Sequence, residues 1–142
     1  IVFVIAAFLS FSTGTAWGTF SILIPIIAPV AHALAPQLLT VSLSATLAGS
    51  VFGDNCSPIS DTTILSSAGT ECNHIDHVTT QLPYAMTVAG CCFVGYITAG
   101  LSGSNVILTL SVSFACLIIA IKFLLRKTPG KAGKQGNRPI QP

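Results

Sequence analysis

Residues 52–63 of this 142-residue sequence read FGDNCSPISDTT. They follow an apolar, small-residue-rich stretch that is long enough to enter a lipid bilayer, yet they place two carboxylates, Asp54 and Asp61, close together. Pro58 lies between them, and proline removes a backbone donor and clashes with the preceding helical turn. The segment therefore predicts a helix that unwinds at residues 53–58 inside a membrane span.

Composition places the whole chain in lipid. Only 7% of the residues are charged and 51% are hydrophobic, whereas a soluble domain has about 25% charged residues. A chain this apolar cannot cover a water-facing surface, so the sequence predicts an all-α, polytopic membrane protein built as a helical bundle.

The apolar stretches and their interruptions predict where the spans lie. The expected spans cover residues 1–35 with an interruption at 12–15, residues 37–68 with the interruption at 53–58, residues 78–101, and residues 106–125. A continuous helix over the first stretch would be longer than the ~20 residues needed to cross a bilayer. We therefore expect this stretch to form either a re-entrant hairpin or a broken helix.

Charge is distributed along the chain in a way that predicts its orientation. All six cations lie at the end of the chain: Lys122, Arg126, Lys127, Lys131, Lys134 and Arg138. Lys and Arg are enriched on cytoplasmic flanks, so residues 126–142 are interpreted as a disordered cytoplasmic tail and not as a nucleic-acid-binding segment. Counting back places the 102–105 turn and the linker at Pro36 outside, and the 70–77 loop inside. The chain starts within an apolar run, and we expect the N-terminal half of the protein to be absent from it.

The two carboxylates inside a span carry the functional prediction. A charge near the bilayer centre costs at least about 2.5–3.5 kcal/mol, and no Lys or Arg precedes Lys122. The partner of Asp54 and Asp61 is therefore a transported cation, a proton or a basic residue elsewhere. Hard cations such as sodium prefer oxygen ligands. The candidate ligands are Asp54, Asp61, Asn55, Ser57, Ser60, Thr62 and Thr63. The alternative is that both Asp residues only cap helix ends.

Two other polar segments have weaker functional readings. Thr13, Gly14 and Thr15 interrupt the first stretch and either face the same cavity or form a flexible turn with Trp17 as an interfacial anchor. The cluster of Cys72, His74, Asp76 and His77 has no zinc-site spacing, so it is interpreted as a polar loop, with cytoplasmic pH sensing as a speculative role.

Residues 52–63, together with STGTAWGTF at residues 12–20, closely resemble the recurrent motifs of the NhaC-type sodium/proton antiporter family. The resemblance implies a partial inverted-repeat fold of the ion transporter superfamily, with broken helices or hairpins. It implies exchange of sodium for protons across the cell membrane, with Asp54 and Asp61 as ion ligands. Some members of that family instead exchange organic acids such as malate and lactate, which stays open as an alternative.

Other function classes are weaker. An intramembrane aspartyl protease carries its two acids on separate helices in a Gly-x-Gly-Asp motif, whereas Val51 occupies the first Gly position here. A passive channel is disfavoured because broken helices with acids suit coupled exchange. The sequence thus predicts a transporter, not an enzyme, with sodium, protons and the lipid bilayer as partners and no cofactor. Homo-oligomer formation stays open.

Overall fold

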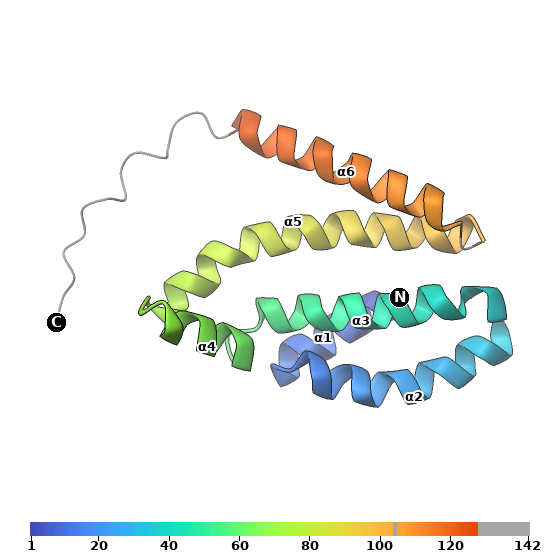
Figure 1. Ribbon diagram of the computed structural model, residues 1–142, viewed down its shortest axis with the longest axis horizontal. Coiled ribbons are helices and arrows are strands. Elements are labelled where there is room, and N and C mark those ends of the chain that lie inside the picture. The colour runs from blue at the N-terminus through green and yellow to red at the C-terminus, as the bar shows by residue number, and fades with distance from the viewer. Residues whose placement is uncertain (104, 128–142) are drawn as a thin grey trace.

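The structure is a computed structural model that describes residues 1–103 and 105–127 (Figure 1). This part of the chain is helical and contains no strand. The helices are α1 (Val2–Thr13), α2 (Ala16–Leu34), the 3₁₀ helix η1 (Pro36–Leu38), α3 (Leu39–Cys56), α4 (Asp61–Gly69), α5 (His74–Leu101) and α6 (Val106–Lys127). The all-α class predicted from composition is confirmed. The tail residues 128–142 lie outside the described residues.

The first stretch forms a helical hairpin, one of the two forms left open by the sequence. Gly14 ends α1 in the left-handed conformation (φ 69°, ψ 21°), and its N–H donates to the carbonyl oxygen of Ser10 at 2.8 Å. Glycine adopts this conformation without the steric penalty of a Cβ. The Thr15 hydroxyl then caps α2 by accepting from the Gly18 N–H. Figure 1 shows α2 turning back alongside α1 and α3.

Helices α1 and α3 pack at very close range because α3 presents two glycines to α1. A Cβ at Gly49 would collide with the carbonyl oxygen of Phe3, and one at Gly53 with that of Ala7. The equal spacing of these pairs along both helices means that α1 and α3 run parallel. Small residues permit such close approach of helices in lipid.

The break after α3 lies at residues 57–60, slightly later than the predicted 53–58. Ser57 is extended (φ −78°, ψ 127°), as expected for a residue before proline, and this ends α3 at Cys56. Gly53 remains within helix α3, and its lack of a side chain allows the close contact with α1; it does not bend the helix. Helix α4 then ends at Gly69, one residue beyond the predicted end of this span at residue 68.

Helix α5 starts at His74, not at residue 78 as the predicted span boundary had it. The Asn73 side chain accepts hydrogen bonds from the N–H groups of Ile75 (3.0 Å) and Asp76 (3.4 Å), and this N-cap extends the helix into the predicted polar loop. His74, Asp76 and His77 are therefore helical residues. Because α5 starts earlier than predicted, side chains of its first turns reach the site described below.

Among the described residues, three helices are long and apolar enough to cross a membrane: Ala16–Leu34, His74–Leu101 and Val106–Phe123. In the most apolar 18-residue stretch of each helix, only 6%, 22% and 0% of the residues are buried within the chain. These apolar faces therefore require lipid or further helices around them. Figure 1 shows the α2–α3 and α5–α6 turns at one end of the bundle and the α4–α5 turn at the other. The assignment of the cytoplasmic end stays a prediction.

Candidate ion-binding site

The two helix interruptions meet in space. A Cβ built on Gly14 would lie 2.8 Å from the carbonyl oxygen of Ile59 and 2.9 Å from its Cγ1 atom. The tip of the α1–α2 hairpin therefore packs directly on the unwound segment between α3 and α4. The sequence left open whether residues 13–15 face the same cavity or form a flexible turn, and the structure brings the Gly14 backbone against Ile59.

Asp54 lies beside this contact, in the last turn of α3, and is only 8% exposed. Its Oδ1 atom accepts a hydrogen bond from the Ser60 hydroxyl at 2.8 Å, and its Oδ2 atom accepts one from the Thr62 hydroxyl at 3.1 Å. The two hydroxyl oxygens are themselves 2.7 Å apart. Because α3 stops at Cys56 and α4 starts at Asp61, the carboxylate spans the break and joins the two helices.

Ser57 supplies a further oxygen in the unwound segment. Its side chain is fully buried, and its hydroxyl has no hydrogen-bond partner in the described part of the chain. Leaving a buried hydroxyl unpaired costs roughly 1–3 kcal/mol. An orphaned oxygen within three residues of a buried carboxylate is therefore a candidate ligand position for a cation.

Three of the predicted ligands, Asp61, Asn55 and Thr63, make no hydrogen bond to Asp54 in the described part of the chain. Asp61 is exposed and sits in the first turn of α4, where a negative charge interacts favourably with the helix dipole. Asn55 is also exposed and faces a separate polar pocket, which Thr63 lines as well. The structure thus brings together Asp54, Ser60 and Thr62, and places Ser57 in the same break.

The hydroxyls of the α1–α2 tip are used locally. Thr13 Oγ1 donates to the Leu9 carbonyl oxygen at 3.0 Å and lies 3.2 Å from Thr19 Oγ1, while Thr15 caps α2. Their side chains hold the hairpin in shape. What the tip contributes at the site is the bare backbone of Gly14 against Ile59.

Sequence reasoning did not assign α5 residues to this region. His74 Nε2 lies 2.6 Å from the Pro58 carbonyl oxygen, and its Nδ1 lies 3.0 Å from the Ser67 hydroxyl. His77 and Gln81 line the polar pocket. The spacing of residues 74, 77 and 81 places them on one face of a helix. This shared face could be inferred from the sequence only if the helix was taken to start at His74.

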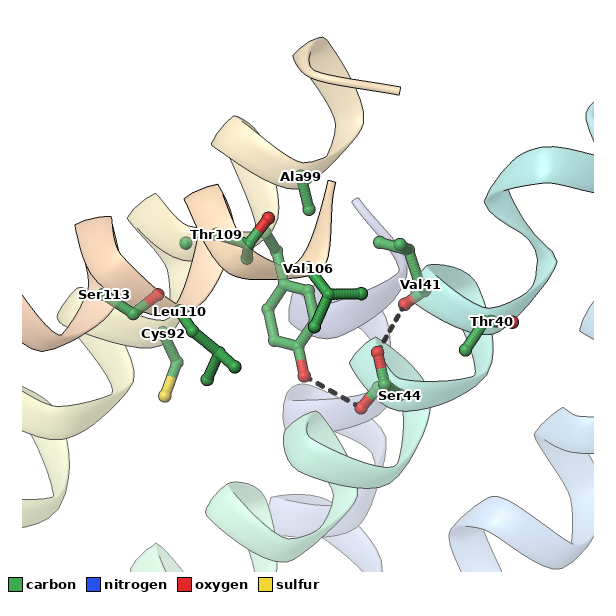
Figure 2. A pocket seen from close by; sticks show the side chains of 11 residues that line it. Thr40, Val41, Ser44, Cys92, Ala99, Val106, Thr109, Leu110 and Ser113 are labelled. Carbon is green, nitrogen blue, oxygen red and sulfur yellow. Dashed lines mark hydrogen bonds between the residues drawn. The ribbon is translucent and has the colours of Figure 1, made fainter. Parts of the chain in front are cut away.

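A larger cavity of about 420 Å³ lies at the other end of the bundle, between α3, α5 and α6 (Figure 2). Its lining is mostly apolar. The Tyr96 hydroxyl donates to the Ser44 carbonyl oxygen at 3.0 Å, and the Ser44 hydroxyl donates to that of Val41 at 3.0 Å. No charged residue lines this cavity. Within the described residues, no group of three His, Cys, Asp or Glu side chains is placed to hold a metal ion.

The fold and site define a class: a multi-pass α-helical membrane protein whose two interrupted helical segments meet beside a buried carboxylate. Secondary transporters bind ions at such broken helices. The chain belongs to the Na+/H+ antiporter family, whose profile matches residues 1–101. This confirms the resemblance carried by residues 12–20 and 52–63.

Two curated relatives extend the comparison. An uncharacterized protein of Haemophilus influenzae is 56% identical over 124 residues, which cover 86% of this chain and 24% of that protein. A malate-2H(+)/Na(+)-lactate antiporter of Bacillus subtilis is 31% identical over 102 residues, which cover 68% of this chain and 22% of that protein. The chain thus spans about a quarter of the length of these relatives. No solved structure matches it.

Proposed function

We propose that this chain belongs to a secondary antiporter that exchanges sodium for protons across the cell membrane, with Asp54 as the group that binds either ion. The observation that carries the proposal is the buried Asp54 carboxylate, bound by Ser60 and Thr62 at a helix break. Membership of the Na+/H+ antiporter family supports it. The basic end of the chain supports a cytoplasmic C-terminus.

The contacts around Asp54 can accommodate a proton. Three short oxygen–oxygen contacts join Asp54, Ser60 and Thr62, at 2.8, 3.1 and 2.7 Å, but the two hydroxyls carry only two protons. With a proton on Asp54 Oδ2, that group donates to Thr62, Thr62 donates to Ser60, and Ser60 donates to Oδ1. The protonated site is then a closed ring in which every contact has its own proton.

The same oxygens also suit a sodium ion. Without the carboxyl proton, both hydroxyls donate to Asp54 and their own 2.7 Å contact holds no proton. A cation can lie among these oxygens because carboxylate and hydroxyl groups coordinate through lone pairs. The positive charge compensates the buried carboxylate. Ser57 would add its unpaired hydroxyl oxygen. Since proton and cation need the same Asp54 oxygens, binding of one opposes binding of the other, which is the requirement for exchange.

The decisive experiment compares charge-neutral variants in proteoliposomes. Sodium added outside should drive proton movement in the wild type, reported by a pH-sensitive dye inside the vesicles. We expect Asp54→Asn to reduce this movement to background, and Asp61→Asn to reduce it less because Asp61 is exposed. Asp76→Asn, an exposed acid on α5, is the matched control. Normal exchange in both Asp54→Asn and Asp61→Asn at equal membrane level would overturn the assignment.

A sodium- and proton-coupled exchanger of organic acids is the second candidate. It is favoured by the printed name of the Bacillus subtilis relative, which specifies malate and lactate. In vesicles loaded with L-lactate, external L-malate should then strengthen sodium-dependent proton movement at least severalfold. A simple sodium/proton antiporter would show no such dependence on either acid.

A further inference from the structure

A polar pocket adjoins the Asp54 cluster. It has a volume of about 230 Å³ and lies where α3, α4 and the start of α5 meet. Its lining contains no carboxylate, Lys or Arg and consists of Asn55, Thr62, Thr63, Ser66, His77 and Gln81. Thr62 also donates to Asp54 Oδ2 at 3.1 Å. One end of the pocket is therefore a single side chain away from the carboxylate.

The polar side chains follow one another from the α4–α5 turn to the break after α3. Because a helix rises about 1.5 Å per residue, His77 and Gln81 lie about 4.5 and 10.5 Å along the axis from His74, the first residue of α5. On α4, Thr62 lies beside the break, and Ser66 lies about one helical turn closer to the α4–α5 turn. Figure 1 shows this turn at one end of the bundle. The pocket thus extends inward from that end toward Asp54.

Most polar groups of the pocket have no protein partner. Within the described residues, the side chains of Asn55, Thr63, Ser66, His77 and Gln81 make no hydrogen bond. Hydrocarbon offers no partner for such groups, so placing them against lipid is costly. Water can pair all of them at once. A row of unpaired polar side chains on facing helices of a membrane protein therefore indicates a water-filled space.

The other spaces near the site have a different lining. A groove of about 600 Å³ between α1, α3 and α5 touches the pocket at Asn55 and Gln81, but its other lining residues are apolar or aromatic. The cavity in Figure 2 shares no lining residue with the pocket. On the α1 side, the backbone of Gly53 packs directly against Ala7. Among the described residues, the pocket is therefore the polar approach to Asp54.

We infer that this pocket is the aqueous inlet through which sodium and protons reach Asp54, and that the described conformation is open toward the α4–α5 turn. The inference rests on the proposed role of Asp54 as the ion-binding group. Neutral hydroxyl and amide oxygens suit an inlet, because they replace part of the hydration shell of a cation without holding it tightly. Access from one end at a time is what alternating access requires. The α4–α5 turn lies at the end predicted to be cytoplasmic, so ions enter this conformation from the cytoplasm.

Cysteine labelling of the full-length transporter tests the inlet. Ser66→Cys on α4 and Gln81→Cys on α5 each have a control at the next residue, Leu65→Cys and Leu82→Cys, which are exposed at nearly the same depth but do not line the pocket. All four are made in a Cys72→Ser background, because Cys72 is exposed. The probe is a membrane-impermeant, cationic methanethiosulfonate. It reacts with thiolates, which form in water and not in lipid.

The inlet predicts fast labelling from one side of the membrane. In vesicles with the cytoplasmic face outward, both pocket variants should react about tenfold faster than their controls or more, because only their thiols reach water. Labelled Gln81→Cys should then lose sodium-driven proton movement relative to the same variant before labelling. Equal rates within each pair would overturn the inference. So would unchanged proton movement after labelling of Gln81→Cys, or faster labelling from the opposite side.

Asp54→Asn separates this inference from the proposed function. If Asp54→Asn abolishes exchange while the pocket variants label no faster than their controls, the inlet is wrong and the antiporter proposal stands. If the pocket variants label as expected while Asp54→Asn exchanges ions normally, the role of Asp54 is wrong, and an inlet leading to it is overturned as well.

Discussion

His74 Nε2 lies 2.6 Å from the carbonyl oxygen of Pro58, so the first residue of α5 is bonded to the unwound segment between α3 and α4. A carbonyl oxygen only accepts, so Nε2 carries the hydrogen. The Nδ1 atom lies 3.0 Å from the Ser67 hydroxyl of α4. One imidazole thus joins the break to α4, and the N-cap Ser60 and the α4 residue Thr62 donate hydrogen bonds to Asp54.

This double contact predicts different effects for two conservative substitutions. His74→Gln keeps a donor near the Nε2 position and His74→Asn keeps one near Nδ1, so only the first retains the Pro58 contact. We expect His74→Asn to raise the sodium concentration for half-maximal exchange about tenfold, as for one lost hydrogen bond in the range of 1 kcal/mol or more. His74→Gln should stay within about threefold of wild type. Equal effects of both on sodium dependence would show that the Pro58 contact does not position the site.

Gly14→Ala should destabilise the protein. Its left-handed backbone (φ 69°) disfavours any Cβ, and that Cβ would lie 2.8 Å from the Ile59 carbonyl oxygen. A loss of about 1 kcal/mol or more is expected for Gly→Ala in an incompatible conformation. Thermal unfolding in detergent measures it. The matched control is Gly90→Ala, because nothing lies within 4 Å of a Cβ at that helical position. An equal shift in both variants would contradict the contact between the two breaks.

Gly53→Ala tests the close packing of α1 on α3. The added methyl group would collide with the Ala7 carbonyl oxygen and lie 2.8 Å from the Phe11 nitrogen, which are rigid backbone atoms. Overpacking of this kind costs typically about 1–3 kcal/mol. We expect a lower unfolding temperature and weaker exchange, since Asp54 is the next residue. Gly100→Ala, with open space around it, should be neutral or stabilising. A wild-type unfolding temperature for Gly53→Ala would mean that α1 and α3 lie farther apart.

Ser57→Ala separates fold stability from transport. The Ser57 hydroxyl is buried without a partner, so its removal should leave stability unchanged or higher. It should nevertheless raise the half-saturating sodium concentration, because a proposed ligand oxygen is lost. Ser50→Ala is the comparison: its hydroxyl donates to the Thr46 carbonyl oxygen at 2.8 Å, so this variant should lose about 1 kcal/mol of stability with normal sodium dependence. If Ser57→Ala shows the Ser50→Ala pattern, Ser57 is structural.

The sequence alone determined the fold class, the two interruptions and the family. These depend on local chemistry. The low charge content indicates that the chain lies in lipid. The ring of Pro58 and the extended backbone of Ser57 before it end α3, and Gly14 adopts a backbone conformation that other residues avoid. Residues 12–20 and 52–63 carried enough of this pattern to identify the family before any contact was known.

Tertiary structure decided which of the oxygens act together. Asp54 and Asp61 look equivalent in sequence, but the close approach of Gly53 to α1 buries Asp54, whereas Asp61 opens α4 and remains exposed. The capped start of α5 brings His74 to Pro58 and His77 to the polar pocket. Burial and hydrogen bonding depend on the packing of helices that are distant in the chain, and a pattern of residue types does not contain that information.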